Sequence, residues 1–280
     1  MNHRPYRSAL YIPGSKKRAL DKARDLPVDV ILFDLEDAVA PDAKVVARST
    51  LATALEAGGY GPRLRVVRMN ALDTVWGADD AAAIALMDCD AVLLPKVNGP
   101  ADLDVFAALF PDKPIWAMIE TPMGVLNAAA IAAHPRMAGF VMGTNDLAKD
   151  LNSRSRAALM TALQMSVLAA KAAGIVVLDG VYNAFKDDEG LTAECAEGRD
   201  MGFDGKTLIH PAQVAICNVA FGPSDAEIDL SNRQITAFDA AEADGQGVAV
   251  VGGKIVENLH IVTAKATLAK AAAIAALEAS

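Results

Sequence analysis

Two acidic residues come shortly after apolar runs in the sequence, and their type and position indicate a metal site. Glu120 follows the run at 114–119, and Asp146 follows the run at 139–142. Carboxylates with no cysteine or histidine beside them suit a hard cation, and Mg²⁺ is typically held by one or two carboxylates. The alternative is that Asp146 caps the next helix and Glu120 pairs with a cationic side chain. The position that both acids share favours a Mg²⁺ site, with Mn²⁺ as an alternative ion.

An arginine at the end of another apolar run is a candidate for binding an acidic substrate. Burying the guanidinium of Arg68 without an anionic partner would be costly. Its planar fork matches a carboxylate or an enolate oxygen, so we expect Arg68 to bind substrate and to act in catalysis. A structural pair with Asp34 or Glu36 is the alternative, and the two roles are compatible.

Three acids crowd into four residues at Asp34, Glu36 and Asp37. They cannot all face a core without compensation, so we expect one or two of them to bind Arg68 or a metal-bound water. Glu36 and Asp37 are candidate catalytic residues on this basis. Helix N-capping is the alternative for Asp37.

The one dense basic stretch lies at residues 16–24, where the first expected helix begins. In an acidic chain, cations at a helix N-terminus are suited to nucleotide phosphates. We therefore expect Lys16, Arg18 and Lys22 to contact substrate. A solvated helix face is the alternative for such a run.

The last apolar run leads into Ile209 and His210, which join Asn145 in the predicted substrate-binding set. His210 has the chemistry of an acid or base. However, Pro211 constrains its loop and no nucleophile stands beside it, so we expect His210 to position the backbone. The sequence also lacks a GxSxG elbow, which argues against a Ser-His-Asp hydrolase.

Eight apolar runs, alternating with Ala- and Leu-rich stretches of helical length, position these residues. They lie at 8–12, 28–33, 64–69, 91–94, 114–119, 139–142, 175–178 and 206–209. This alternation predicts parallel strands buried on both faces. Each run is followed closely by polar side chains, and the strand ends of a (β/α)8 TIM barrel converge on the face where active sites form. An open doubly wound sheet is the rival fold, but residues 12–15 lack its Gly-rich first turn.

Composition narrows the function classes further. The formal net charge of -9 argues against nucleic-acid binding, which needs clustered Lys and Arg. The three cysteines show no CxxC spacing, so we expect reduced thiols and a cytoplasmic protein. We expect no signal peptide and no membrane span, because charges interrupt the apolar stretches.

The pattern changes after Phe221, where Gly222 and Pro223 mark a boundary. A helix over 225–243, a short β-hairpin near 248–253 and a final helix from about Glu257 are expected. We therefore divide the chain into a catalytic barrel over 1–222 and a C-terminal helix–hairpin–helix segment over 223–280. That segment is expected to act as a lid or an oligomer contact.

Five stretches taken together resemble a known family. They lie at 7–14, 33–39, 95–97, 119–122 and 205–211. The sequence is similar there to the citrate lyase β-subunit-like enzymes of the HpcH/HpaI aldolase superfamily, which act on CoA esters. The resemblance implies a (β/α)8 barrel that forms trimers or hexamers. It also implies Mg²⁺ on Glu120 and Asp146, with Arg68 binding a carboxyl or keto oxygen of the substrate.

One position in the tail bears on which reaction is catalysed. Residues 181–185 and 253–260 are similar to the (3S)-malyl-CoA thioesterases of this family. Many of its lyases carry a tail Asp that reaches the neighbouring subunit's site, whereas this chain has Glu257. The extra methylene moves the carboxylate, and a displacement of about 1 Å can cost on the order of 10²-fold in rate. Glu257 therefore favours Mg²⁺-dependent hydrolysis of (3S)-malyl-CoA to malate and CoA.

Two other activities stay open at this point. One is carbon–carbon cleavage of malyl-CoA or citramalyl-CoA to acetyl-CoA and a 2-oxo acid. The other is a citrate lyase β-like subunit that needs an acyl-carrier partner. The acyl group stays open as well, because a pocket distinguishes one methyl group by only about 1–3 kcal/mol.

Overall fold

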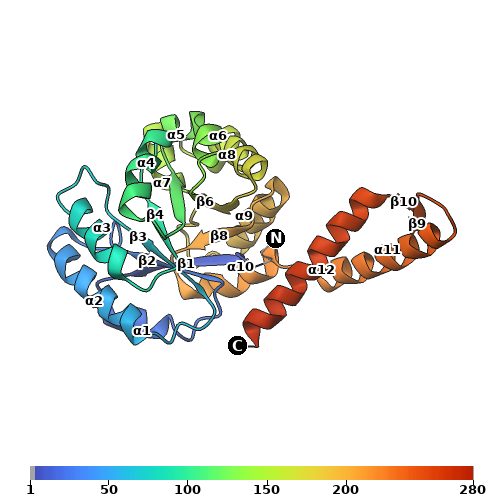
Figure 1. Ribbon diagram of the computed structural model, residues 1–280, viewed down its shortest axis with the longest axis horizontal. Helices are drawn as coiled ribbons and strands as arrows, with labels where there is room; N and C mark the ends of the chain where they lie inside the picture. Colours follow the sequence, from blue (N-terminus) through green and yellow to red (C-terminus); the bar gives the residue numbers. More distant parts are fainter. Residues whose placement is uncertain (1–3, 280) are drawn as a thin grey trace. The chain divides into compact units, whose positions relative to one another are not determined.

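The computed structural model describes residues 4–279, which divide into a unit over Tyr6–Ala220 and a unit formed by residues 4–5 and 221–279. In the first unit, eight parallel strands follow one another in chain order around a closed barrel, with helices outside it (Figure 1). The strand β1 pairs with both β2 and β8, which closes the ring. The predicted TIM barrel is therefore confirmed.

The barrel strands begin and end no more than two residues from the predicted bounds. They are β1 (Ser8–Pro13), β2 (Val30–Asp34), β3 (Leu64–Arg68), β4 (Ala91–Leu94), β5 (Ile115–Ile119), β6 (Met137–Met142), β7 (Val176–Asp179) and β8 (Gly205–Leu208). The agreement follows from composition, because runs of Val, Ile and Leu buried on both faces carry a strong local signal.

Helices follow each of the barrel strands, the last one included. They are α1 (Lys17–Lys22), α2 (Lys44–Ala57), α3 (Gly77–Leu86), α4 (Pro100–Leu109), α5 (Pro122–Leu126), α6 (Ala128–Ala132), α7 (Thr144–Asp150), α8 (Met160–Ala173), α9 (Asp188–Met201) and α10 (Val214–Phe221). Three short 3₁₀ turns, η1 (Pro41–Ala43), η2 (Arg156–Leu159) and η3 (Pro211–Gln213), precede α2, α8 and α10.

The barrel interior is a packed core made by alternate residues of the strands. It includes Ala9, Val30, Leu32, Val66, Ala91, Leu93, Trp116, Met118, Val141 and Leu178. Trp116 belongs to this core, and a Cβ on Gly139 would lie only 2.9 Å from its ring. A register shift between β5 and β6 at Ile115 and Trp116 accompanies this close approach. Since strand side chains alternate, the next inward positions are those at the carboxyl ends.

Acidic residues tie neighbouring strands together at the opposite, amino-terminal ends. Asp29, Asp90 and Asp204 each precede a strand and accept the amide N–H of a residue in or beside the previous strand, at 2.7, 2.8 and 2.9 Å. The guanidinium groups of Arg7 and Arg65 also bind Asp29 and Asp90 through two nitrogens each. This end of the barrel is built for stability, which is its usual role in the fold.

The C-terminal unit contains a helix, a β-hairpin and a second helix. These are α11 (Asp225–Ala243), the antiparallel strands β9 (Ala249–Val251) and β10 (Lys254–Val256), and α12 (Asn258–Glu278). A small core joins them through Phe238, Ala241, Ala249, Val256 and Ile261. The helix–hairpin–helix order matches the sequence expectation.

By length and composition alone, α12 could cross a membrane, which the sequence analysis did not anticipate. It is the one such helix within residues 4–279. A single helix of this kind indicates little, because core helices of soluble proteins satisfy the same criteria. In this unit, Ile261 of α12 packs into the small core described above.

Candidate active site

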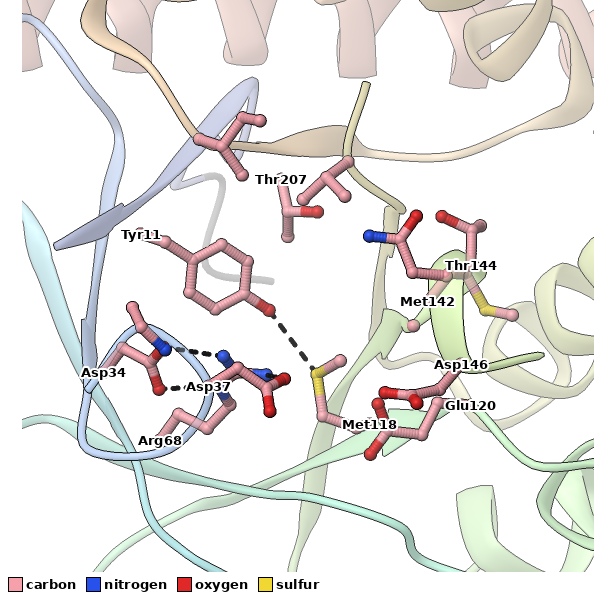
Figure 2. A pocket seen from close by; sticks show the side chains of 15 residues that line it. Tyr11, Asp34, Asp37, Arg68, Met118, Glu120, Met142, Thr144, Asp146 and Thr207 are labelled. Carbon is pink, nitrogen blue, oxygen red and sulfur yellow. Dashed lines mark hydrogen bonds and ion pairs between the residues drawn. The ribbon is translucent and has the colours of Figure 1, made fainter. Parts of the chain in front are cut away.

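The carboxyl ends of the strands surround a cavity of about 260 Å³. Alternation along the strands places Tyr11, Asp34 and Arg68 two residues beyond the apolar core positions Ala9, Leu32 and Val66 (Figure 2). The cavity is lined by Tyr11, Asp34, Asp37, Ala38, Arg68, Met118, Glu120, Met142, Gly143, Thr144, Asn145, Asp146, Val181, Thr207 and Ile209. Six of these belong to the predicted site: Asp37, Arg68, Glu120, Asn145, Asp146 and Ile209.

Glu120 and Asp146 lie next to each other on one wall of this cavity (Figure 2). Glu120 is 2% exposed and follows β5, and Oε1 accepts the backbone N–H of Lys96 at 2.7 Å. Asp146 lies in the first turn of α7, and the N-cap of that helix is Gly143. The alternative that Asp146 caps this helix is therefore wrong. The alternative that Glu120 pairs with a cationic side chain is wrong as well, because neither acid forms an ion pair within the described residues.

The electrostatics of Glu120 fit a bound cation. Burial raises the pKa of its carboxyl to about 7, the Lys96 amide and Arg68 oppose this shift, and the charge of Asp146 adds to it. Gly143 leaves the necessary room, because a Cβ there would lie 2.5 Å from Glu120 Oε2. Two oxygen ligands without a neutralising partner suit Mg²⁺. Residues 4–279 contain no group of three or more potential metal ligands, so an ion would take its other ligands from water or substrate.

The guanidinium of Arg68 is surrounded by the carboxylates of Asp34, Glu36 and Asp37. Its Nε and Nη2 donate to the two oxygens of Asp34 at 2.8 and 2.6 Å, and both side chains are buried. Nη1 lies 2.9 Å from Glu36 Oε2 and 3.2 Å from Asp37 Oδ2. The structural pair with Asp34 is therefore present, while Nη1 is the nitrogen nearest to the more exposed acid, Asp37.

The three acids behave differently because their surroundings differ. Asp34 also accepts the amides of Glu36 and Ala38, both at 2.9 Å, so Asp34 is the residue that organises this turn. The alternative that Asp37 caps a helix is wrong, since Ala40 precedes the next helical turn and the Asp37 side chain is 67% exposed beside Arg68.

Glu36 combines burial with poor hydrogen bonding. Oε2 is close to Arg68 but has no hydrogen bond of good geometry. Burial raises the pKa of this carboxyl to about 8, the charge of Arg68 lowers it, and the acids Asp37, Glu120 and Asp34 raise it. A proton on Glu36 is therefore exchangeable near neutral pH, as general acid–base chemistry requires.

The other predicted ligand-binding residues fall into two groups. Asn145 and Ile209 line the cavity, and Asn145 Oδ1 accepts a hydrogen bond from Asn183 at 2.8 Å. His210 does not line it. The His210 ring accepts the Ala212 amide through Nδ1 at 3.2 Å and stacks on Phe185 with centroids 4.6 Å apart. These contacts match a backbone-positioning role.

Lys16, Arg18 and Lys22 are all exposed, on or just before the short helix α1, and lie outside the cavity lining. The intervening Lys17 pairs with Asp21 at 2.7 Å. Within the part of the chain that the structure describes, Lys16, Arg18 and Lys22 form no ion pair. Since α1 follows the carboxyl end of β1, Lys16 leaves the barrel at the same end as the cavity.

Glu257 belongs to the C-terminal unit. It is exposed, stands at the N-cap of α12, and its amide donates to His260 Nδ1 at 3.0 Å.

Tyr11, Met118 and Thr207 also line the cavity and were not among the predicted site residues, although inward alternation along the strands would have indicated them. An ion network around Asp179 of β7 and Lys206 of β8 was not predicted either. There, Lys206 is fully buried and binds Asp179 at 2.9 Å and Glu194 at 2.6 Å, while Arg156 holds Asp179 with two nitrogens.

Comparisons with known proteins agree with this geometry. The model of the HpcH/HpaI aldolase/citrate lyase family matches residues 7–211. A (3S)-malyl-CoA thioesterase of Cereibacter sphaeroides (strain KD131) is 64% identical over 99% of this chain and 98% of its own length. The citrate lyase subunit beta of Escherichia coli (strain K12) is 33% identical over 96% of this chain and 94% of its own length.

Solved structures of related proteins are also similar to this chain. CitE of Mycobacterium tuberculosis in complex with magnesium, acetoacetate and coenzyme A is similar, with a TM-score of 0.82 and 28% identity. That match covers 96% of this chain and 99% of the other. The citrate lyase beta subunit of M. tuberculosis with oxaloacetate and magnesium has a TM-score of 0.71 and 31% identity, covering 80% of this chain and all of the other.

Proposed function

We propose that this chain, which belongs to the HpcH/HpaI aldolase/citrate lyase family, is a Mg²⁺-dependent thioesterase that hydrolyses (3S)-malyl-CoA to malate and CoA. The observation that carries the proposal is the Glu120–Asp146 pair beside Arg68 in one cavity. Full-length similarity to the (3S)-malyl-CoA thioesterase at 64% identity supports this choice of substrate and reaction.

Glu120 and Asp146 would hold the metal. When bound, Mg²⁺ supplies positive charge that stabilises negative charge developing on substrate oxygens. Mn²⁺ offers the same kind of charge to these carboxylates. Burial is the largest single influence and works against the charge of Arg68, but the groups around it, Asp34 foremost, together outweigh burial and keep the pKa of the guanidinium high. Its Nη1 would bind the free carboxylate of the malyl group in exchange for the exposed carboxylate of Asp37.

Hydrolysis itself needs a water molecule and a base. The water oxygen bonds to the thioester carbon, the C–S bond breaks, and the water protons pass to the base and to the departing CoA sulfur. Glu36 and Asp37 are the candidate bases within the barrel, because both lie beside Arg68, which lines the cavity. Glu257 of the C-terminal unit is the third candidate.

The CoA moiety would lie toward the basic segment. Lys16, Arg18 and Lys22 are cations without ion-pair partners in the described chain, so they are available for phosphates. Asn145 and Ile209 would contact the acyl part from the cavity wall, and His210 would order the loop beside them.

The C-terminal unit would act as a lid and an oligomer contact in a homotrimer or hexamer, bringing Glu257 to a neighbouring subunit. Exposed apolar side chains support this role, among them Val250, Ile255, Leu259 and Val262. The three free cysteines are all buried, and we propose a cytoplasmic location, where such thiols remain reduced.

Carbon–carbon cleavage is the second candidate, and similarity to citrate lyase beta subunits favours it. The lyase reaction would use the same cavity and release acetyl-CoA and glyoxylate. An acyl-carrier-dependent subunit would instead leave free CoA esters unchanged. The products of one incubation therefore separate the three activities.

The test incubates the purified protein with (3S)-malyl-CoA and Mg²⁺ and identifies the products. Malate with free CoA is expected, whereas acetyl-CoA with glyoxylate, or no turnover, would overturn the thioesterase proposal. Glu120→Ala and Asp146→Ala should each abolish turnover. Asp150→Ala is the matched control, because Asp150 is an exposed acid on the same helix as Asp146. Wild-type rates in either site variant would rule out the metal assignment.

A further inference from the structure

The phenol of Tyr11 projects into the cavity with only a weak hydrogen-bond partner. Its hydroxyl donates to the thioether sulfur of Met118 at 3.5 Å, and sulfur is a poor acceptor. Figure 2 shows the hydroxyl pointing from β1 toward Met118, on the side of the cavity where Glu120 and Asp146 lie. A substrate oxygen would be a better partner, because an oxygen accepts a hydrogen bond more strongly than a thioether sulfur does.

The Tyr11 ring is held in place by the buried ion pair beside it. The guanidinium carbon of Arg68 lies 4.8 Å from the ring centroid, a distance suited to a cation–π contact. Asp34 in turn fixes Arg68 through two hydrogen bonds. The hydroxyl is therefore positioned before any ligand arrives, which is how a donor stabilises developing charge without reorganisation.

Tyr11 keeps its proton at neutral pH. Burial raises the pKa of the phenol above its ordinary value, Arg68 opposes the shift, and the carboxylates of Asp34, Glu120 and Glu36 add to it. The hydroxyl is thus available as a donor, and not as a base.

Most other side-chain donors that line the cavity are already engaged. Arg68 binds its three acids, as described above. The Thr207 hydroxyl donates to the carbonyl oxygen of Asp179 at 3.0 Å, and the Asn145 amide faces Asn183 at 3.4 Å. Among the side chains, the hydroxyl of Thr144 is the remaining rival, since it makes no hydrogen bond within the described residues.

Building on the proposed hydrolysis, we propose that Tyr11 is a catalytic residue whose hydroxyl donates a hydrogen bond to the carbonyl oxygen of the thioester. As water bonds to the carbonyl carbon, the C=O electron pair moves onto that oxygen. The Tyr11 hydroxyl stabilises this charge until the pair returns and the C–S bond breaks. The proton of Tyr11 stays on its own oxygen throughout.

The test compares steady-state kinetics of Tyr11→Phe and wild type with (3S)-malyl-CoA and Mg²⁺, following free CoA. Loss of one such donor is expected to lower kcat by on the order of 10²-fold, because the contact strengthens as charge develops. KM should change little. Thermal unfolding midpoints of the two proteins are measured alongside, and Phe preserves the ring over Arg68.

Tyr60→Phe is the matched control. The Tyr60 side chain is buried, and its hydroxyl has no partner within residues 4–279, but it packs edge-on against Phe33 away from the cavity lining. Its kcat should equal that of wild type. Thr144→Val tests the rival donor and should retain most of the activity.

The outcomes separate the two proposals. Free CoA released by wild type, with a large loss of kcat in Tyr11→Phe alone, supports the role of Tyr11. Wild-type kcat in Tyr11→Phe, or a large loss in Thr144→Val instead, overturns that role and leaves the hydrolase intact. If wild type releases no free CoA, the hydrolase proposal and the role of Tyr11 both fall.

Discussion

The two oxygens of Asp34 hold Arg68 along one edge, at 2.8 Å from Nε and 2.6 Å from Nη2, with both side chains buried. Asp34 also accepts two backbone amides of the following turn. One carboxylate thus joins β2, β3 and the loop that carries Glu36 and Asp37. The orientation of Arg68, and through it that of Tyr11, depends on this pair.

Asp34→Asn should therefore destabilise the protein strongly. Breaking a buried ion pair by removing one partner typically costs about 3–5 kcal/mol. Glu36 and Asp37 contact only Nη1 and would compensate the charge of Arg68 in part. The free energy of unfolding in urea measures the loss. Asp37→Asn is the control: Asp37 contacts the same guanidinium but is 67% exposed, so its loss should stay within about 1 kcal/mol. Equal losses in the two variants would contradict the assignment.

The stability of the metal-free protein should fall as pH rises through the range where Glu120 ionises. Its pKa is about 7 in the folded protein and 4.5 in the reference state. The folded state therefore holds the proton more tightly, and this contribution is complete below about pH 4.5 and lost by about pH 7. The loss is on the order of 3 kcal/mol, since each pKa unit corresponds to about 1.4 kcal/mol.

Glu120→Gln isolates this contribution. Chemical unfolding from pH 5 to pH 8 in the presence of a chelator should show a smaller decline for the variant than for wild type. Glu56→Gln serves as the control, because Glu56 is exposed on α2. Parallel curves for wild type and Glu120→Gln would show that Glu120 does not titrate in this range.

Lys96 adopts a left-handed backbone conformation, with φ at 52°, while its amide donates to Glu120. This conformation costs a residue with a Cβ roughly 1–2 kcal/mol and costs glycine little. Lys96→Gly should therefore be more stable than Lys96→Ala by about 1 kcal/mol. The free energies of unfolding of the two variants provide the comparison, and since both remove the ammonium, they differ only in the Cβ. A more stable alanine variant would show that the strain is absent.

The barrel and the convergence of its polar strand ends were predictable from the sequence. Runs such as 91–94 are apolar throughout, so each strand carries its own local signal, and the end of one strand must adjoin the end of the next in a parallel barrel. The meeting of Glu120 and Asp146 follows from this rule alone. The helix over Asp225–Ala243 was likewise predictable, because a Gly-Pro boundary precedes it, and the structure adds a capping box between Ser224 and Glu227 in its first turn.

Only the tertiary structure decided which partners the charged groups take. The sequence offered three acids as partners for Arg68. In the folded protein, two nitrogens of Arg68 bind the buried Asp34, while Asp37 stays at the surface. The buried network of Lys206, Asp179 and Arg156 and the left-handed amide of Lys96 were equally hidden. Strand formation depends on neighbouring residues in the chain, whereas an ion pair or a hydrogen bond depends on distances of a few ångströms between residues far apart in it.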